Sequence, residues 1–296
     1  MTWQIPCVLA VLLGPAQEGR KPATYARPRL LIDAAELAKP EAARKFRILD
    51  VRSLDEYKRG HIVHASTIDT PAWHKEFTAG PDKKTWEKRL GQLGIDADTP
   101  VVVYGDDPRE AARVWWILRF WGIRDVRLLN GGWKAWKEAG GRTDTGLYTE
   151  PYYDPKESKL SPLTDCLADK EELLENVKRK RFQVADARSE KEYRGEEKKA
   201  KRGGAIPGAC RLEWVEVIDP KTQRFKGPVE LAKVIKEAGI DLGRPTVTYC
   251  QSGGRASVLA FALELMGAKD VRNYYRSWAE WGNDPDTPVV KPKVNR

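Results

Sequence analysis

The sequence is poor in the residues that build metal sites, disulfide frameworks and histidine-assisted active sites. Its 296 residues contain three histidines and four cysteines, and no histidine follows His74. After Cys7 only Cys166, Cys210 and Cys250 remain, which is too few for a disulfide framework, and no two cysteines have the spacing of metal ligands. We therefore expect no metal, no organic cofactor and at least one free thiol, while a pairing of Cys166 with Cys210 stays open.

The chain also has no apolar run long enough to cross a bilayer. The stretch "IPCVLAVLLGPA" near the N-terminus is too short to span, and small residues surround a plausible cleavage point after Ala16. Residues 1–20 therefore resemble a signal peptide, although no Lys or Arg precedes the stretch and Pro6 interrupts it. We expect a periplasmic or secreted protein without a membrane span, with a cytoplasmic protein as the alternative.

Charged residues are numerous and well mixed. The 52 Lys and Arg residues exceed the 43 Asp and Glu residues and give a formal charge of +9, but no basic run interleaved with aromatics marks a nucleic-acid groove. The positive excess can help to steer small anions, so we expect a small anionic substrate and no nucleic-acid partner. Trp115, Trp116 and Trp121 fall at helical spacing, which predicts packing in a core or domain interface rather than ligand stacking.

An internal repeat organises the chain. Residues 101–136 align without gaps with residues 246–281, at an offset of 145 positions, and residues 48–57 align with residues 184–193 at an offset of 136. Identical residues at equivalent positions include Tyr104 and Tyr249, Gly122 and Gly267, Trp133 and Trp278, Asp50 and Asp186, and Arg52 and Arg188. The repeat predicts a duplicated structural unit.

Strand and helix patterns alternate in both copies. In each, a Ser-x-x-Glu capping box, beginning at Ser53 and at Ser189, follows a strand directly. This predicts an α/β fold with two tandem units, each a mainly parallel sheet flanked by helices on both faces. The units are expected at residues 28–140 and 169–290, and the Gly-, Pro- and Tyr-containing residues 141–168 are typical of a linker.

Residues 246–267, "TVTYCQSGGRASVLAFALELMG", predict a strand, a short loop and a helix. The β-branched and aromatic residues before Cys250 favour a strand, and the apolar run closed by Gly267 favours a helix. Cys250 is thus expected at the carboxyl end of the strand. The six residues that begin with Cys250 must turn the chain sharply, and Gly253 and Gly254 supply the backbone freedom for that turn.

Such a loop points its backbone N–H groups inward. Together with the positive end of the following helix, these amides predict an anion-binding concavity formed by Gln251, Ser252, Gly253, Gly254 and Arg255. A thiol at the rim of the concavity should ionise more readily than a free cysteine, whose pKa is about 8.5. The pattern favours a nucleophilic Cys250, and the alternative is a buried cysteine that ends a core strand.

The repeat separates these two interpretations. In the gapless alignment Gly105 stands opposite Cys250 and Glu110 stands opposite Arg255, within the acidic sequence "GDDPRE". An acidic loop should repel the anion that the second loop attracts, so the difference favours a functional thiol in the second half only. Because no histidine follows His74, a papain-like Cys–His pair within that half is excluded, and the loop itself must favour the thiolate.

The motifs "LDVRSLDEYKRGHI", "YCQSGGRAS", "LNGGWKAW" and "SWAEWGNDPDTPV" resemble those of tandem-domain rhodaneses, the thiosulfate/3-mercaptopyruvate sulfurtransferase family. The resemblance covers roughly residues 30–290. It implies an inactive N-terminal domain and a catalytic C-terminal domain that carries Cys250. One departure is "GHIVHA" at residues 60–65, where the second half has "GAIPGA", so that His61 has no counterpart and is expected to be structural.

The resemblance implies a double-displacement mechanism. The Cys250 thiolate attacks the outer sulfur of a donor such as thiosulfate and expels sulfite, and the resulting persulfide passes its sulfur to cyanide or a thiol acceptor. The amides of residues 251–255 would cradle the anionic sulfur. Arg188 matches the family's donor-contacting arginine, and the alternative is an ion pair with Asp186 or Glu192.

The donor is predicted from the residues that follow the cysteine. Ser252 favours 3-mercaptopyruvate, because a hydroxyl can hydrogen-bond a carbonyl or carboxylate. Arg255 and Arg188 would offer two cations to the thiosulfate dianion, and on this count we expect thiosulfate to be the better donor.

Two further function classes compete with sulfur transfer. A phosphatase of this fold needs five residues between its Cys and Arg, whereas Cys250 and Arg255 enclose four. A non-catalytic rhodanese-like binding module fits the first half but not a second half that keeps Cys, Gly and Arg. We expect a monomer that binds an anionic sulfur donor and a thiophilic acceptor.

Overall fold

The structure is a computed structural model that describes residues 24–148 and 153–293. The segment predicted as a signal peptide, residues 1–20, lies outside the described residues. Within the described ranges, no helix has the length and apolar character needed to cross a membrane.

The first unit is built on a five-stranded sheet in the order β1-β6-β5-β2-β4, in which all neighbouring strands are parallel. Its strands are β1 (Leu31–Ile32), β2 (Arg47–Asp50), β4 (Ser66–Thr67), β5 (Val101–Tyr104) and β6 (Val126–Leu129). Its helices are α1 (Ala34–Leu37), α2 (Pro40–Lys45), α3 (Leu54–Arg59), α4 (Thr70–Ala79), α5 (Lys83–Gln92), α6 (Pro108–Phe120) and α7 (Gly132–Glu138), after a 3-10 turn at Pro28–Leu30. A separate antiparallel pair joins β3 (His61–Ile62) and β7 (Thr143–Asp144).

The second unit repeats this plan with a four-stranded parallel sheet in the order β11-β10-β8-β9. Its strands are β8 (Gln183–Asp186), β9 (Ala209–Arg211), β10 (Thr246–Tyr249) and β11 (Val271–Asn273). Its helices are α8 (Lys170–Arg179), α9 (Glu190–Arg194), α10 (Pro228–Glu237), α11 (Gly254–Leu265) and α12 (Ser277–Trp281), with 3-10 turns at Thr164–Cys166 and Trp214–Val217. The predicted α/β fold of two tandem units with mainly parallel sheets is confirmed.

Helices cover both faces of each sheet. Alternate residues of a strand point to opposite sides, and in the central strands both sets are buried, so each face packs against helices. In β5, Val101 and Val103 pack in the core that contains α6, whereas Val102 and Tyr104 pack with the tryptophans of α7. All four residues of β5 and of β10 are buried, as expected for central strands of parallel sheets. Both predicted capping boxes, at Ser53 and Ser189, are formed.

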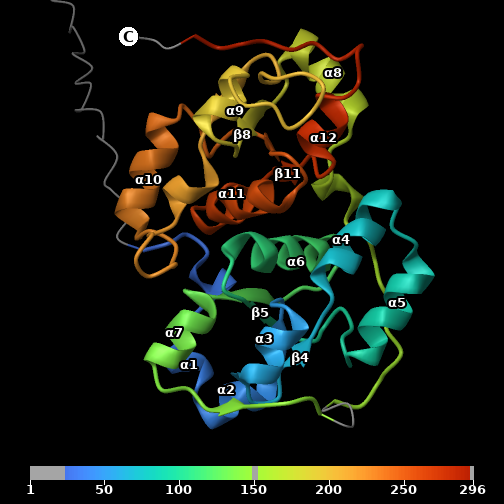
Figure 1. Ribbon diagram of the computed structural model, residues 1–296, viewed down its shortest axis with the longest axis vertical. Coiled ribbons are helices and arrows are strands. Elements are labelled where there is room, and N and C mark those ends of the chain that lie inside the picture. The colour runs from blue at the N-terminus through green and yellow to red at the C-terminus, as the bar shows by residue number, and fades with distance from the viewer. Residues whose placement is uncertain (1–23, 149–152, 294–296) are drawn as a thin grey trace, which may run out of the picture.

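The two units meet through α6 and α11, which lie side by side in the middle of the molecule (Figure 1). Trp115 of α6 packs edge to face against Phe261 of α11, with ring centroids 4.9 Å apart, inside one hydrophobic core that both units share. The two helices begin at the same end of the interface, since a Cβ on Gly254, the first residue of α11, would lie 3.5 Å from the carbonyl oxygen of Arg109 in the first turn of α6. At the other end, Arg119 and Glu264, which occupy equivalent repeat positions, form an ion pair of 2.9 Å.

The connecting segment runs along the outside of the first unit before it enters α8 (Figure 1). The Arg47 guanidinium lies 3.8 Å from the centroid of the Tyr153 ring, and the Lys156 N–H donates to the Gly91 carbonyl at 3.0 Å. Tyr148 accepts a hydrogen bond from the His64 N–H at 3.0 Å. These contacts hold the segment on the first unit.

Candidate active site

The chain turns from β10 into α11 through Cys250 and three further residues. The helix begins at Gly254, two residues before the apolar run that predicted it, because Gly253 takes a left-handed conformation (φ 88°) and its carbonyl accepts the Ser257 N–H at 2.8 Å. The N–H groups of Gly254 and Arg255 are therefore the unpaired first-turn amides of α11, and they continue the row of amides in the loop.

The carbonyls of this loop are bonded to the protein, and its amides are not. The Cys250 carbonyl accepts from the Trp278 N–H at 3.0 Å, the Gln251 carbonyl from the Ala279 N–H at 2.9 Å, and the Ser252 carbonyl from Arg113 at 2.8 Å. Across residues 24–148 and 153–293, no acceptor bonds the N–H groups of residues 251–255. Five consecutive free donors at the start of a helix form a concavity suited to an anion.

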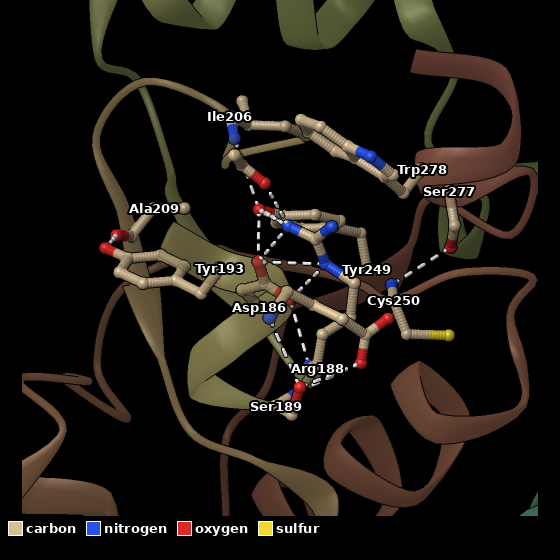
Figure 2. Close-up of polar contacts among 12 residues, drawn as sticks. Asp186, Arg188, Ser189, Tyr193, Ile206, Ala209, Tyr249, Cys250, Ser277 and Trp278 are labelled. Carbon is tan, nitrogen blue, oxygen red and sulfur yellow. Dashed lines mark hydrogen bonds and ion pairs between the residues drawn. The ribbon is translucent and has the colours of Figure 1, made fainter. Parts of the chain in front are cut away.

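Cys250 is buried at the end of β10, and its backbone is fixed by Ser277. The Cys250 N–H donates to Ser277 Oγ at 3.1 Å (Figure 2). Ser277 Oγ in turn donates to the Tyr274 carbonyl at 2.7 Å. Ser277 has a φ of 56°, a left-handed conformation that a side chain disfavours, and Gly132 stands at the equivalent repeat position with a φ of 55°. Ser277 therefore has a strained backbone where the first unit has glycine, and its hydroxyl holds the backbone of Cys250.

Arg255 points its guanidinium at Glu192 rather than into bulk solvent. Its two terminal nitrogens donate to the two Glu192 oxygens at 2.6 and 2.9 Å, and Glu192 also closes the capping box with Ser189. Desolvation acts to raise the pKa of Glu192, but the hydrogen bonds and charge of Arg255 outweigh it and lower the pKa to about 2. The Gln251 side chain donates to the Lys199 carbonyl at 3.0 Å, which ties the loop to the neighbouring segment.

Arg188 is 1 % exposed and lies in an ion pair with Asp186 (Figure 2). Its Nε and Nη2 donate to the Asp186 carboxylate at 2.9 and 2.6 Å, and Nη2 also donates to the Gly204 carbonyl at 2.7 Å. Tyr249 donates to Asp186 at 2.5 Å and accepts from the Ile206 N–H at 3.2 Å. The structure contains the ion pair of Arg188 with Asp186, while Glu192 pairs with Arg255. A contact of Arg188 with the donor stays a prediction.

The first unit contains the same network without a thiol. Arg52 donates to Asp50 at 3.0 and 2.6 Å and to the Gly60 carbonyl at 2.7 Å, and Tyr104 donates to the same carboxylate. Trp133 covers Arg52 at 4.3 Å as Trp278 covers Arg188 at 4.2 Å. Since a unit without cysteine keeps every one of these contacts, they belong to the fold. They use Nε and Nη2 of Arg188, and in the first unit the remaining nitrogen, Nη1 of Arg52, lies 3.9 Å from Asp106 of the equivalent loop.

The other thiols lie apart from the loop. Among the described residues Cys166 and Cys210 are free thiols, so no disulfide joins them. Burial raises the pKa of Cys166 to about 11 and also raises the pKa of Cys210. Neither is therefore ionised at neutral pH.

Comparison with known proteins places the chain in a family. The model of the Rhodanese-like domain matches residues 33–139 and again residues 169–284, so the chain belongs to the rhodanese family, with two copies of the domain.

Its relatives include the sulfur carrier protein TtuD of Thermus thermophilus, 34% identical over 90% of this chain and 98% of that protein. The thiosulfate sulfurtransferase of Azotobacter vinelandii is 31% identical over 90% of this chain and 98% of that protein. The anaerobic ergothioneine biosynthesis enzyme of Chlorobium limicola has a similar solved structure, with a TM-score of 0.80, 25% identity, and coverage of 91% of this chain and 72% of that one. The family and these relatives support a sulfurtransferase role.

Matched substitutions of the two buried arginines test whether Arg188 serves the fold or the donor. We expect Arg52→Lys and Arg188→Lys to lower the free energy of unfolding by similar amounts, about 1–3 kcal/mol, because each loses charge-assisted hydrogen bonds in the same network. Urea unfolding measures this, and steady-state kinetics should show an unchanged KM for the donor in both variants. A tenfold rise in donor KM confined to Arg188→Lys would contradict the interpretation.

Replacement of Ser277 separates backbone strain from the hydroxyl contact. Ser277→Gly and Ser277→Ala both remove the hydroxyl that holds Cys250, so we expect both to slow sulfur transfer by about tenfold. The glycine variant should be more stable than the alanine variant by about 1–2 kcal/mol, because only glycine is free of the left-handed penalty. Thermal unfolding and turnover check the two parts separately, and parent-like turnover in either variant would remove the role assigned to the hydroxyl.

Proposed function

We propose that the chain is a thiosulfate sulfurtransferase that carries sulfur as a persulfide of Cys250. The observation that supports this most directly is the row of five unpaired amides, residues 251–255, beside a cysteine at the end of a central strand. Such amides stabilise a terminal sulfur that becomes anionic during the reaction. The thiosulfate sulfurtransferases among the relatives support the choice of donor.

In the first half-reaction the Cys250 thiolate attacks the outer sulfur of thiosulfate. A bond forms between Cys250 Sγ and that sulfur, the S–S bond of thiosulfate breaks, and its electron pair leaves with sulfite. The product is the Cys250 persulfide, whose outer sulfur faces the amides of the loop. Ser277 holds the cysteine backbone while the new bond forms.

In the second half-reaction a thiophilic acceptor, cyanide or a thiolate, attacks the outer sulfur of the persulfide. The bond between the two sulfurs breaks, its electron pair returns to Cys250 as thiolate, and the acceptor leaves as thiocyanate or as a new persulfide. No residue of the chain has to take up a proton in either step, which fits a loop where no side chain of the described residues hydrogen-bonds Cys250 Sγ.

The donor preference now depends on Arg255 and the amides. The expectation of two cations for thiosulfate counted Arg188, and Nε and Nη2 of that guanidinium donate to Asp186. Arg255 is also paired, with Glu192, but its side chain is 13% exposed and close enough to Cys250 for their charges to interact. Arg255 and the amide row therefore remain as the groups that favour a compact dianion.

Replacement of Cys250 tests the proposal directly. We expect Cys250→Ser to abolish thiocyanate formation, and intact-mass analysis of the parent after incubation with thiosulfate to show one added sulfur that maps to Cys250. Gly105→Cys in the Cys250→Ser background should restore nothing, because a Cβ at position 105 would lie 2.6 Å from Cγ2 of Val51. Measurable turnover by the Cys250→Ser variant would overturn the assignment, and phosphate release from an aryl phosphate would favour the phosphatase alternative.

The Arg255→Thr variant tests the donor. We expect the parent to have the higher kcat/KM for thiosulfate, and the variant to shift the preference towards 3-mercaptopyruvate, for which Ser252 supplies a hydroxyl. Because the substitution leaves the buried Glu192 with Lys199, 3.9 Å away, as its remaining cation, the double variant Arg255→Thr/Glu192→Gln is the control that removes both charges together. A parent that favours 3-mercaptopyruvate tenfold, or about 1.4 kcal/mol, would show that the cation was given too much weight.

A further inference from the structure

A buried arginine of the first unit contacts the Cys250 loop of the second. Arg113 lies on α6, is 7% exposed, and is surrounded along the helix by buried apolar residues. Its equivalent in the second unit is Val258, a core residue of α11. A charge at a position where the repeat has valine is costly unless specific bonds compensate for the lost hydration.

The bonds of Arg113 reach across the interface between the units. Nη1 donates to the Ser252 carbonyl at 2.8 Å and to the Tyr275 hydroxyl at 3.0 Å. On its own helix, Nε donates to Glu110 at 3.0 Å. Glu110 occupies the repeat position equivalent to Arg255. Its carboxylate repels anions from the first loop, and it also orients the Arg113 guanidinium, which binds the Cys250 loop.

The Ser252 carbonyl sets the direction of one amide in the row. The peptide between Ser252 and Gly253 is planar and trans, so its N–H points opposite to its C=O. With the carbonyl bound to Arg113 on the side of the first unit, the Gly253 N–H points away from Arg113, and no acceptor among the described residues bonds it. Rotation of this peptide would break the bond to Arg113 and remove the central donor of the row.

The same contacts explain both glycines of the loop. A Cβ on Gly254 would lie 2.6 Å from Arg113 Nη2, and a Cβ on Gly253 would lie 2.6 Å from the Tyr275 ring. The Tyr275 hydroxyl in turn lies 3.0 Å from Nδ1 of His74 on α4 of the first unit. Desolvation and the charge of Arg113 lower the pKa of His74 to about 4, so the ring is neutral at neutral pH. Its Nδ1 lies 2.9 Å from Arg113 Nη1, which can only donate, so Nδ1 is an acceptor and takes a hydrogen bond from the Tyr275 hydroxyl as well.

We propose that the first unit positions the persulfide-binding loop of the second, with Arg113 as a positioning residue that orients the Gly253 N–H through the Ser252 carbonyl. The proposal rests on the proposed function and assigns the first unit a part in it. The first unit has no thiol at the equivalent position, and instead it contributes Arg113, which holds the Cys250 loop of the second unit.

Arg113→Met tests the proposal, and Arg119→Met is the matched control. Arg119 lies six residues further along the same helix and also bonds across the interface, to Glu264, but at the end remote from Cys250. We expect Arg113→Met to raise the KM for thiosulfate roughly tenfold to a hundredfold, because a Gly253 N–H that no longer points correctly weakens binding of the anion. Arg119→Met should lose a similar amount of thermal stability while its KM stays within twofold of the parent value.

A purely structural role would give a different result. If Arg113 only stabilises the fold, the variant has a smaller folded fraction. The apparent kcat then falls in proportion to the amount of reactive Cys250 thiol, and KM stays unchanged. If Arg113→Met yields too little folded protein, Arg113→Lys keeps the charge and a single donor, and its KM should lie between those of the parent and of a variant without the bond. A parent-like KM in whichever of these variants folds overturns the inference.

The two proposals fail in distinguishable ways. A parent chain that gains no sulfur from thiosulfate by intact-mass analysis overturns the proposed function, and this inference with it. A parent that gains the sulfur, together with an Arg113 variant that keeps the parent KM, overturns only the positioning role.

Discussion

The packing of α6 against α11 is the contact on which the arrangement of the candidate site depends. Nearly every side chain of the two helices is buried, and their shared core joins the two units into one body. Because both helices begin at the same end of the interface, the loops that precede them lie near one another (Figure 1). Helix α6 therefore does two things: it packs in the core of the first unit, and through Arg113 it contacts the Cys250 loop of the second unit.

Duplication supplied two copies of one frame, and a few positions decide what each copy does. The buried Asp, Arg and Tyr that fix the strand ends are the same in both units. The differences fall around the loops, where Cys250, Arg255 and Ser277 stand opposite Gly105, Glu110 and Gly132. As a result of these differences, only the second unit has the thiol beside a row of free amides. The first unit has Arg113 opposite Val258, and this arginine contacts the loop of the second unit.

The sequence predicted what depends on local pattern and on the repeat. The duplicated parallel sheets, the capping boxes at Ser53 and Ser189 and the loop from Cys250 all follow from periodicity and turn residues. The partner of Arg188 stayed open, because Asp186 and Glu192 lie close along the chain on either side of it and spacing cannot choose between them. The contact between Arg113 and Ser252 joins residues 139 positions apart and depends on how the units pack, so its only trace in the sequence was an arginine opposite Val258.

The pairing of the site's cations bears on turnover as well as on binding. Arg188 and Arg255 each face a carboxylate, Asp186 and Glu192, so these four groups carry no net charge between them. The attraction for anions then comes mainly from amide dipoles, which act over a short range and at one place. In the proposed reaction the persulfide sulfur carries one negative charge against the amides, whereas the departing sulfite is a dianion. Two unpaired guanidiniums would hold that dianion more strongly than Arg255 does when it is paired with Glu192. The pairing therefore weakens retention of sulfite, while the amide row still binds the persulfide sulfur.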